Sequence, residues 1–278
     1  MEKIGFLGLG KMGFPMSKRL LENGSYELHV YNRTSGVASS LGAKVASSPA
    51  ELSSEVNRLV IMVSDDRACE DVLFGQNGVA ESTGRPLVIN MSTISPNASS
   101  EFESRLRQKG FEYIEAPVLG SVGPAEQGTL VILAAGKHRE RATDLFDIFG
   151  RVTYSYPEVG IAAKVKLLIN TNLGVQIAVL SETLGAAEKL GIPVSDFLDV
   201  VNDSAVKTIV SQFKAKNLLS GEYPPAFPYK HLLKDLNYSI AMSSEVGAKN
   251  DVARGVRDIY AEGNDLMDQD FSAVRKLY

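Results

Sequence analysis

Short apolar runs alternate with longer amphipathic stretches through the first half of the chain. Each apolar run has the length of a buried strand and is followed by polar residues, glycine or proline. The predicted strands are Ile4–Leu7, Glu27–Tyr31, Leu59–Val63, Leu87–Met91, Tyr113–Val118, Leu130–Ala135 and Val152–Tyr156. The predicted helices are Phe14–Asn23, Thr34–Leu41, Pro49–Ser54, Arg67–Leu73 and Asn97–Lys109. This alternation predicts an α/β fold of Rossmann type, a doubly wound and mainly parallel sheet with helices on both faces.

From Gly160 onward the pattern indicates helices alone. Ile161–Leu190 contains no proline and is apolar around much of its circumference, which predicts a long helix buried on more than one side. Further helices are predicted at Val194–Ser204, Ala205–Leu219, His231–Val246 and Ala248–Glu262, with an extended segment at Tyr223–Phe227. We therefore expect a Rossmann domain at residues 1–160 and an all-helical domain, joined to it by the long helix, at residues 161–278.

Composition limits the classes of function. The 278 residues are 44% hydrophobic and 22% charged, as in an ordinary globular protein. A net charge of −4 gives no overall attraction to nucleic acid or anionic lipid, so a small molecule is the expected ligand. One cysteine and three widely separated histidines predict neither a disulfide nor a metal site. Because Glu2 and Lys3 run directly into a strand and no uncharged run of about 18 residues is present, we expect a cytoplasmic protein that does not bind membranes.

The glycines of GLGKMG suggest a phosphate-binding turn. They follow the first predicted strand and precede a helix that starts near Phe14. In a dinucleotide fold, Gly8 allows the tight turn, Gly10 lets the backbone approach a pyrophosphate, and Gly13 lets helix and strand pack closely. The alternative is a turn that only needs small residues. The position between strand and helix favours the dinucleotide, and the predicted cofactor contacts are Gly8, Leu9, Gly10, Lys11, Met12 and Gly13.

The end of the second predicted strand indicates which cofactor is used. An NAD site usually has an acidic residue there to bind the ribose hydroxyl, whereas this chain has Asn32, followed by Arg33 and Thr34. A guanidinium and a hydroxyl suit the 2′-phosphate of NADP(H). A surface arginine at a helix start is the alternative. We predict NADP(H), with Asn32, Arg33 and Thr34 as contacts.

Taken in order, four motifs cover nearly the whole chain. They are GLGKMGFPM at 8–16, EAPVLGSVGPAEQGTL at 115–130, GIAAKVKLLINTNLG at 160–174 and KHLLKDL at 230–236. In this order they resemble the β-hydroxyacid dehydrogenase family. The segments NRT, PAEQGTLVILAAG, YPPAFPYKH and DFSAV resemble its glyoxylate and succinic semialdehyde reductase branch.

The resemblance implies that a lysine near the start of the long helix is catalytic. Gly160, Ala162 and Lys166 fill the family's GxGxxxK frame, with Ala162 in place of the second glycine, and Asn170 follows four residues after the lysine. Spacing of four puts Lys166 and Asn170 on one helix face, where both can address one oxygen. Reduction of a carbonyl leaves negative charge on that oxygen, so a proton donor is needed. Lysines on helices are usually solvated, and Lys164 is expected to be one of those.

The loop Pro117–Gly123 would bind the substrate carboxylate through backbone N–H groups at Gly120, Ser121 and Val122. The alternative is a plain surface turn. Relatives often have serine where this chain has Leu119, so an apolar side chain replaces a hydroxyl that was expected to meet the substrate. At strand ends, the resemblance predicts cofactor contacts from Val63, Ser64 and Thr93, with Thr93 also near the substrate. In the helical domain, it predicts Lys234 and Asp235 at the cofactor, Lys234 also at the substrate, and Phe227 over the pocket.

The sequence thus predicts an NADP(H)-dependent reductase of small aldehydo- or keto-acids, forming a homodimer or homotetramer through its helical domain. Alternatives are a 3-hydroxyisobutyrate or tartronate semialdehyde dehydrogenase of the same family. A catalytically silent dinucleotide-binding module is the alternative of another class. Imine reductases share the scaffold, but generally carry another residue at the position of Lys166.

Overall fold

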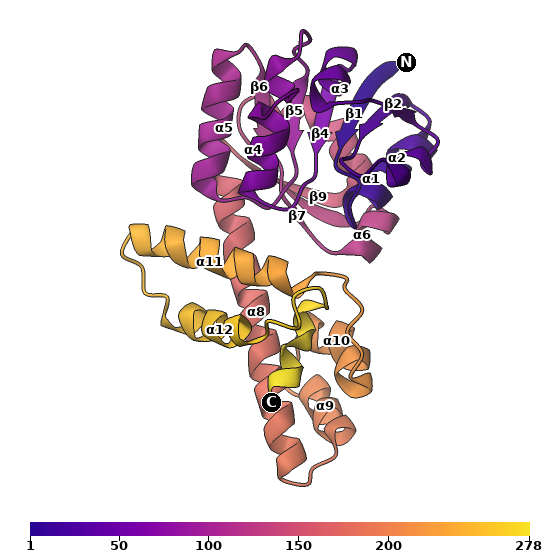
Figure 1. Cartoon of the computed structure of the whole chain (residues 1–278). Helices are drawn as coiled ribbons and strands as arrows, with labels where there is room; N and C mark the ends of the chain where they lie inside the picture. Colours follow the sequence, from indigo (N-terminus) through magenta and orange to yellow (C-terminus); the bar gives the residue numbers. More distant parts are fainter. The chain divides into compact units, whose positions relative to one another are not determined.

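The computed structural model describes residues 1–278, apart from the side chain of Ser35. The chain forms two compact units, Met1–Lys166 and Leu167–Tyr278. Their boundary lies within the long helix α8 (Ile161–Lys189), and the order of the elements can be followed in Figure 1. Each unit has an apolar core of its own.

A nine-stranded sheet forms the centre of the first unit. Its strands are β1 (Glu2–Leu7), β2 (Tyr26–Tyr31), β3 (Lys44–Val45), β4 (Arg58–Ile61), β5 (Leu87–Asn90), β6 (Glu112–Glu115), β7 (Val118–Leu119), β8 (Leu130–Ala135) and β9 (Gly150–Tyr156). The spatial order is β3-β2-β1-β4-β5-β6-β8-β7, and β9 pairs with β8. The pairs up to β6 are parallel, whereas β8 runs antiparallel to β6 and β7. The predicted Rossmann-type, mainly parallel sheet is confirmed.

Helices cover both faces of this sheet because alternate side chains of each strand point to opposite sides. Ile4 and Phe6 of β1 belong to one apolar cluster, and Leu7 belongs to another. The first cluster packs against α1 (Gly13–Asn23), α2 (Ser35–Ser39), α6 (Val122–Gln127) and α7 (Thr143–Phe149). The second packs against α3 (Pro49–Glu55), α4 (Asp66–Phe74) and α5 (Pro96–Gln108). Strands buried on both faces explain the nearly continuous apolar runs in the sequence.

The single strand expected at Tyr113–Val118 is wrong. β6 ends at Glu115, and β7 begins at Val118 and pairs antiparallel with β8. Pro117 lies at the break, where it has no N–H for a sheet ladder, and its carbonyl accepts from Leu133 N. The sequence analysis also missed β3, α6 and α7, which are short and carry weak periodic patterns.

The second unit is helical. Besides the rest of α8 it contains α9 (Val194–Asp203), α10 (Ile209–Ser220), α11 (Tyr229–Glu245), α12 (Asp251–Glu262) and the 3₁₀ segment η3 (Phe271–Leu277). Thr208 and Ser211 cap α10 reciprocally, so this helix starts at Ile209 and not at the predicted Ala205. By length and composition alone α8 could cross a membrane. Its residues Ile177 and Leu184 nevertheless pack in the core of this unit, as in a core helix.

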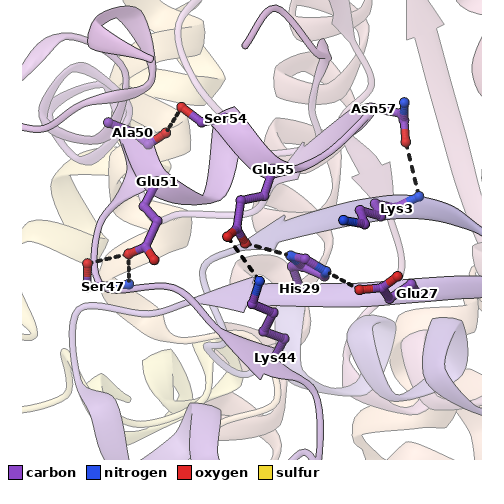
Figure 2. Close-up of polar contacts among 10 residues, drawn as sticks. All are labelled: Lys3, Glu27, His29, Lys44, Ser47, Ala50, Glu51, Ser54, Glu55 and Asn57. Carbon is purple, nitrogen blue, oxygen red and sulfur yellow. Dashed lines mark hydrogen bonds and ion pairs between the residues drawn. The ribbon is translucent and has the colours of Figure 1, made fainter. Parts of the chain in front are cut away.

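A polar cluster fastens β2 to its neighbours. Figure 2 shows His29 between two carboxylates, with Nε2 at 2.7 Å from Glu27 and Nδ1 at 3.0 Å from Glu55 of α3. Lys44 of β3 donates to the other oxygen of Glu55 at 2.9 Å. Hydrogen bonds from Lys44 and then His29 lower the pKa of Glu55, although burial opposes them. The cluster holds β2, β3 and α3 together just before the strand end that carries Asn32.

A second ion cluster surrounds Arg58 on β4, whose side chain is only 8% exposed. Its guanidinium donates to both oxygens of Asp144 on α7, at 2.6 and 2.8 Å, and to both oxygens of Glu2. Burial by itself raises the pKa of Asp144, but hydrogen bonds from Arg58 and Tyr26, together with the charge of Arg58, outweigh it and lower this pKa to about 2.

We predict that Asp144→Asn lowers the free energy of unfolding at neutral pH by about 1 kcal/mol, a value reduced for solvent screening because Asp144 is partly exposed. The wild-type advantage should be complete above the unfolded-state pKa of 3.8 and should vanish as the pH falls to the folded-state value of about 2. Urea unfolding between pH 2 and pH 7 measures this difference. A difference that does not depend on pH would contradict the assignment.

Candidate functional site

The turn after β1 can exist only with glycine at two positions. Gly8 has φ +97°, and a Cβ atom there would lie 2.2 Å from the Met62 carbonyl oxygen. A Cβ at Gly13 would lie 1.9 Å from the Gly8 oxygen. A Cβ at Gly10 would meet no atom within 4 Å. Gly8 and Gly13 therefore serve packing, whereas Gly10 leaves open space beside the backbone, as close approach of a pyrophosphate requires.

The N-terminus of α1 lies directly after this turn. Met12 precedes the helix without a side-chain cap, and the first turn contains no acidic residue. Its backbone N–H groups and the positive end of the helix dipole therefore meet no carboxylate from its own first turn, which suits an anionic ligand. Lys11 is exposed, and Leu9 is buried in the core. These features fit the diphosphate of a dinucleotide, which we predict contacts Gly8, Leu9, Gly10, Lys11, Met12 and Gly13.

Asn32 has a structural task that the sequence analysis did not foresee. Its Oδ1 accepts from Leu9 N at 2.9 Å, and its Nδ2 donates to the Thr34 oxygen at 2.9 Å. An aspartate could accept but not donate, so the amide suits this pair of contacts. Asn32 thereby holds the glycine turn against the end of β2. Arg33 and Thr34 are exposed at the same strand end.

The ends of β4 and β5 meet at the same edge, because parallel strands align their carboxyl ends. Val63 N donates to Ser92 Oγ at 2.9 Å, and Ser64 Oγ donates to Asp65 at 2.7 Å. Thr93 is partly exposed next to the buried Ser92. Ligands of open α/β sheets bind at this edge. The structure therefore places Val63, Ser64 and Thr93 on the same edge as the glycine turn.

The loop expected at Pro117–Gly123 is shorter than predicted, because β7 and α6 take up part of it. Gly120 has φ +120°, but Ser121 is already the N-cap of α6 and Val122 is its first residue. Leu119 packs beside a small apolar cluster that contains Ala162, so both departures from the family pattern share one environment. The Leu119 side chain and the Ala162 methyl group thus belong to the same apolar region.

Lys166 and Asn170 lie one turn apart on α8, and both are buried, with exposed fractions of 7% and 3%. Lys164 is exposed, as expected for a solvated lysine. Burial of a lysine in an apolar stretch costs free energy unless the group is paired or used. The exposures thus separate the two lysines as the motif predicted.

Asn170 is oriented by a second predicted residue. Its Nδ2 donates to Asp235 Oδ2 at 2.6 Å, and Asp235 is 1% exposed. Asp235 Oδ1 is 3.2 Å from Lys234 Nζ, an ion pair without regular hydrogen-bond geometry. The Lys234 ammonium also stands over the Tyr238 ring. Because Asn170 Nδ2 donates to Asp235, the Oδ1 atom of the Asn170 side chain points away from this carboxylate.

Phe227 is held by a residue outside the predicted site. Asp270 is fully buried, and its Oδ2 accepts from the backbone N–H groups of Ala226 and Phe227 at 3.2 and 3.1 Å. Lys214 Nζ lies 2.8 Å from Asp270 Oδ1. The carboxylate therefore fixes the Tyr223–Phe227 segment.

Two acidic residues in the motifs were thus overlooked. Glu115 ends β6 and binds the start of α8, and Asp270 begins the DFSAV segment. Each is a charged residue beside apolar neighbours, which was the available signal for a buried carboxylate with partners. Among the described residues, no group of three His, Cys, Asp or Glu side chains could hold a metal ion.

The fold and the glycine turn define a dinucleotide-binding protein. Residues 3–160 match the family described as the NAD binding domain of 6-phosphogluconate dehydrogenase. Residues 160–278 match the one described as NAD-binding of NADP-dependent 3-hydroxyisobutyrate dehydrogenase. The chain belongs to the β-hydroxyacid dehydrogenase family and uses a nicotinamide dinucleotide, which confirms the predicted family and cofactor class.

Individual relatives cover the whole chain. It is 36% identical to glyoxylate/succinic semialdehyde reductase 1 of Arabidopsis thaliana, with 98% of this chain and 96% of that protein covered. It is 34% identical to the cytokine-like nuclear factor N-PAC of Mus musculus, over 100% of this chain and 51% of that protein. The crystal structure of 3-hydroxyisobutyrate dehydrogenase from Salmonella typhimurium matches with a TM-score of 0.90 at 25% identity, and both chains are fully covered.

We predict that Gly10→Ala separates cofactor binding from folding. The added methyl group meets no protein atom, so the midpoint of thermal unfolding without cofactor should not fall. The methyl group would obstruct the pyrophosphate, and the Kd for NADPH should rise by about tenfold, or about 1.4 kcal/mol. Fluorescence titration measures this Kd. Gly13→Ala should instead destabilise the protein, and an unchanged Kd in Gly10→Ala would rule out the phosphate contact.

Proposed function

We propose that this protein reduces a small aldehydo- or keto-acid to the hydroxyacid with NADPH, and that Lys166 donates the proton. The observation that carries the proposal is the buried pair Lys166 and Asn170, one turn apart on α8. A developing alkoxide needs a proton donor and a hydrogen-bond donor, and a buried lysine beside a buried amide can supply both.

The chemistry divides between the bound cofactor and the chain. When bound, the nicotinamide would supply the hydride that the carbonyl carbon receives. Lys166 gives its proton to the carbonyl oxygen as negative charge develops there, and it takes that proton back in the reverse oxidation. Asn170, whose amide is held by Asp235, keeps the ammonium or the oxygen in place. The substrate carboxylate is assigned to Gly120, Ser121 and Val122, with Thr93, Lys234 and Phe227 as further contacts.

NADP(H) is the proposed form of the cofactor. The exposed Arg33 offers a planar set of donors next to Thr34, at the strand end where a 2′-phosphate would stand. Asn32 supports this position through the glycine turn and puts no carboxylate there to repel the phosphate. Val63, Ser64, Lys234 and Asp235 complete the proposed cofactor contacts.

Succinic semialdehyde and glyoxylate are the proposed substrates, because the Arabidopsis relative carries both in its name. The structural relative from Salmonella favours a second candidate, 3-hydroxyisobutyrate. The rival of another class is a dinucleotide-binding module without turnover, and the relative N-PAC is named as a nuclear factor and not as an enzyme. Following NADPH absorbance with a series of short aldehydo-acids distinguishes these functions. Cofactor binding without oxidation of NADPH by any of them would favour the silent module.

Assembly through the helical unit is part of the proposal. Several large apolar side chains of α8, α9 and α10 are exposed in the single chain: Leu168, Ile169, Val179, Val200, Ile209, Phe213 and Leu219. Such side chains in water favour burial against another surface. A second copy of this chain is the proposed partner, in a homodimer or homotetramer.

We predict that Lys166→Ala lowers kcat by roughly 10²- to 10⁴-fold, the usual contribution of general acid catalysis. The Kd for NADPH should stay nearly unchanged, because the role assigned to Lys166 concerns the substrate oxygen. Lys164→Ala is the matched control, since that lysine is exposed two residues earlier on the same helix, and it should retain its activity. Steady-state kinetics measure kcat, and a separate titration measures the Kd for NADPH. Full activity in Lys166→Ala would overturn the proposed mechanism.

We predict that Arg33→Ala weakens NADPH binding by about 1.5–3 kcal/mol, the range for hydrogen bonds to charged groups. NADH lacks the 2′-phosphate and should bind as before. Arg151→Ala, which removes an exposed arginine from β9, is the control for general loss of positive charge. Calorimetric titration with both cofactors measures the effect. Equal losses for NADPH and NADH would show that Arg33 does not read the phosphate.

A further inference from the structure

A buried carboxylate lies at the end of β6, and neither cofactor binding nor proton donation uses it. Glu115 is 2% exposed. Its Oε2 accepts from Gly160 N at 2.9 Å and from Ala162 N at 3.1 Å. Its Oε1 has no partner of regular hydrogen-bond geometry among the described residues. One oxygen of Glu115 thus binds the N–H group just before α8 and one N–H group in its first turn.

The buried surroundings of Glu115 disfavour the negatively charged form of its side chain. Burial raises the pKa of its carboxyl group, and hydrogen bonding by Ser99 and by the N–H groups of Gly160, Ala163 and Ala162 only partly opposes this effect. Cys69 and Tyr113 are the other titratable groups in the polar cluster beside it. A buried carboxylate of this kind is a poor source of stability. Carboxyl groups with strongly shifted pKa values are concentrated at functional sites.

The contact controls how α8 begins. Gly160 has φ +94°, a conformation that L side chains rarely adopt, and its N–H points to Glu115. α8 starts at the next residue and carries Lys166 in its second turn. Two hydrogen bonds to one oxygen fix both the position and the rotation of this first turn. The direction in which Lys166 leaves the helix depends on that rotation.

A chain of polar groups runs from the proposed cofactor edge to residues beside Glu115. Val63 N donates to Ser92 Oγ at 2.9 Å, and Ser92 N donates to Asn90 Oδ1 at 3.1 Å. Asn90 Nδ2 donates to Tyr113 OH at 3.1 Å, and Tyr113 OH is 3.1 Å from Ser99 Oγ. Asn90 pairs in register with Glu115 across β5 and β6. These hydrogen bonds therefore tie the ends of β4 and β5 to β6 beside Glu115.

We propose that Glu115 is a positioning residue for the reaction, because it holds the first turn of α8 at the rotation from which Lys166 delivers its proton. The inference rests on the role proposed above for Lys166. It adds that the carboxylate acts through the backbone of Gly160 and Ala162 and touches neither substrate nor cofactor. Displacement of a catalytic group by about 1 Å can lower the rate by about 10²-fold. The contact of Glu115 with the start of α8 therefore affects kcat by setting the position of Lys166.

Three substitutions in the full chain test the proposal. Glu115→Ala removes the acceptor, Glu115→Asp withdraws it by one methylene group, and Glu115→Gln keeps an acceptor oxygen at the same reach. With succinic semialdehyde and NADPH, we expect kcat to fall by about ten- to hundredfold in the Ala and Asp variants. The KM for the aldehyde and the Kd for NADPH should stay within about twofold. Glu115→Gln should restore most of kcat.

Asp144→Asn is the matched control for loss of stability, because it also removes a carboxylate from the first unit and its partners are on β2 and β4. It should lower the unfolding midpoint without changing kcat. Unchanged kcat in Glu115→Asp, or a fall that only follows the loss of stability seen in the control, overturns the proposal. The Asp and Gln variants keep the test decisive if the Ala variant does not fold.

Lys166→Ala in the same assay distinguishes the two proposals. If it loses activity while all Glu115 variants keep theirs, only the positioning role fails. If Lys166→Ala remains fully active, the proposed function fails, and the role of Glu115 fails with it.

Discussion

The first unit depends on the close contact of three stretches of backbone: the turn after β1, the start of α1 and the end of β4. Side chains cannot enter these contacts, since a Cβ at Gly8 or Gly13 would lie about 2 Å from a carbonyl oxygen. Because α1 lies this close to the sheet, its N-terminus opens at the edge where β4 and β5 also end. The dinucleotide site follows from this packing, and Gly10 is left beside open space where a phosphate can approach.

Polar side chains repeatedly hold backbone segments of the candidate site. Asn32 binds Leu9 N and so fixes the glycine turn, Glu115 binds the start of α8, and Asp270 binds the backbone of Phe227. In each case a side-chain oxygen accepts an N–H group that regular secondary structure leaves unpaired, which lowers the cost of burying both partners. Backbone segments that carry expected ligand contacts, such as the glycine turn and Phe227, are therefore held by polar side chains from other parts of the chain.

The site was only partly predictable from the sequence. The glycine spacing predicted the tight turn after β1, and the GxGxxxK frame singled out Lys166, which is buried while Lys164 is exposed. The roles of Glu115 and Asp270 were missed, because their partners are backbone N–H groups far away in the chain. The sequence predicted one loop over Pro117–Gly123, whereas β7 covers Val118–Leu119 and α6 starts at Val122. Leu119 and Ala162 looked like separate departures, and only their shared apolar cluster relates them.

By itself, the sequence determined the kind of protein: a βα alternation gives a parallel sheet, spaced glycines give its phosphate turn, and an apolar helical half follows. These features are local, since each depends on the period of apolar residues or on the conformations that glycine allows. Only the tertiary structure decided that β6 ends at Glu115, that Asn32 serves the turn, and that Asp235 orients Asn170. Those contacts join residues far apart in the chain. A hydrogen bond between such residues does not change the spacing of apolar residues, so the sequence pattern does not predict it.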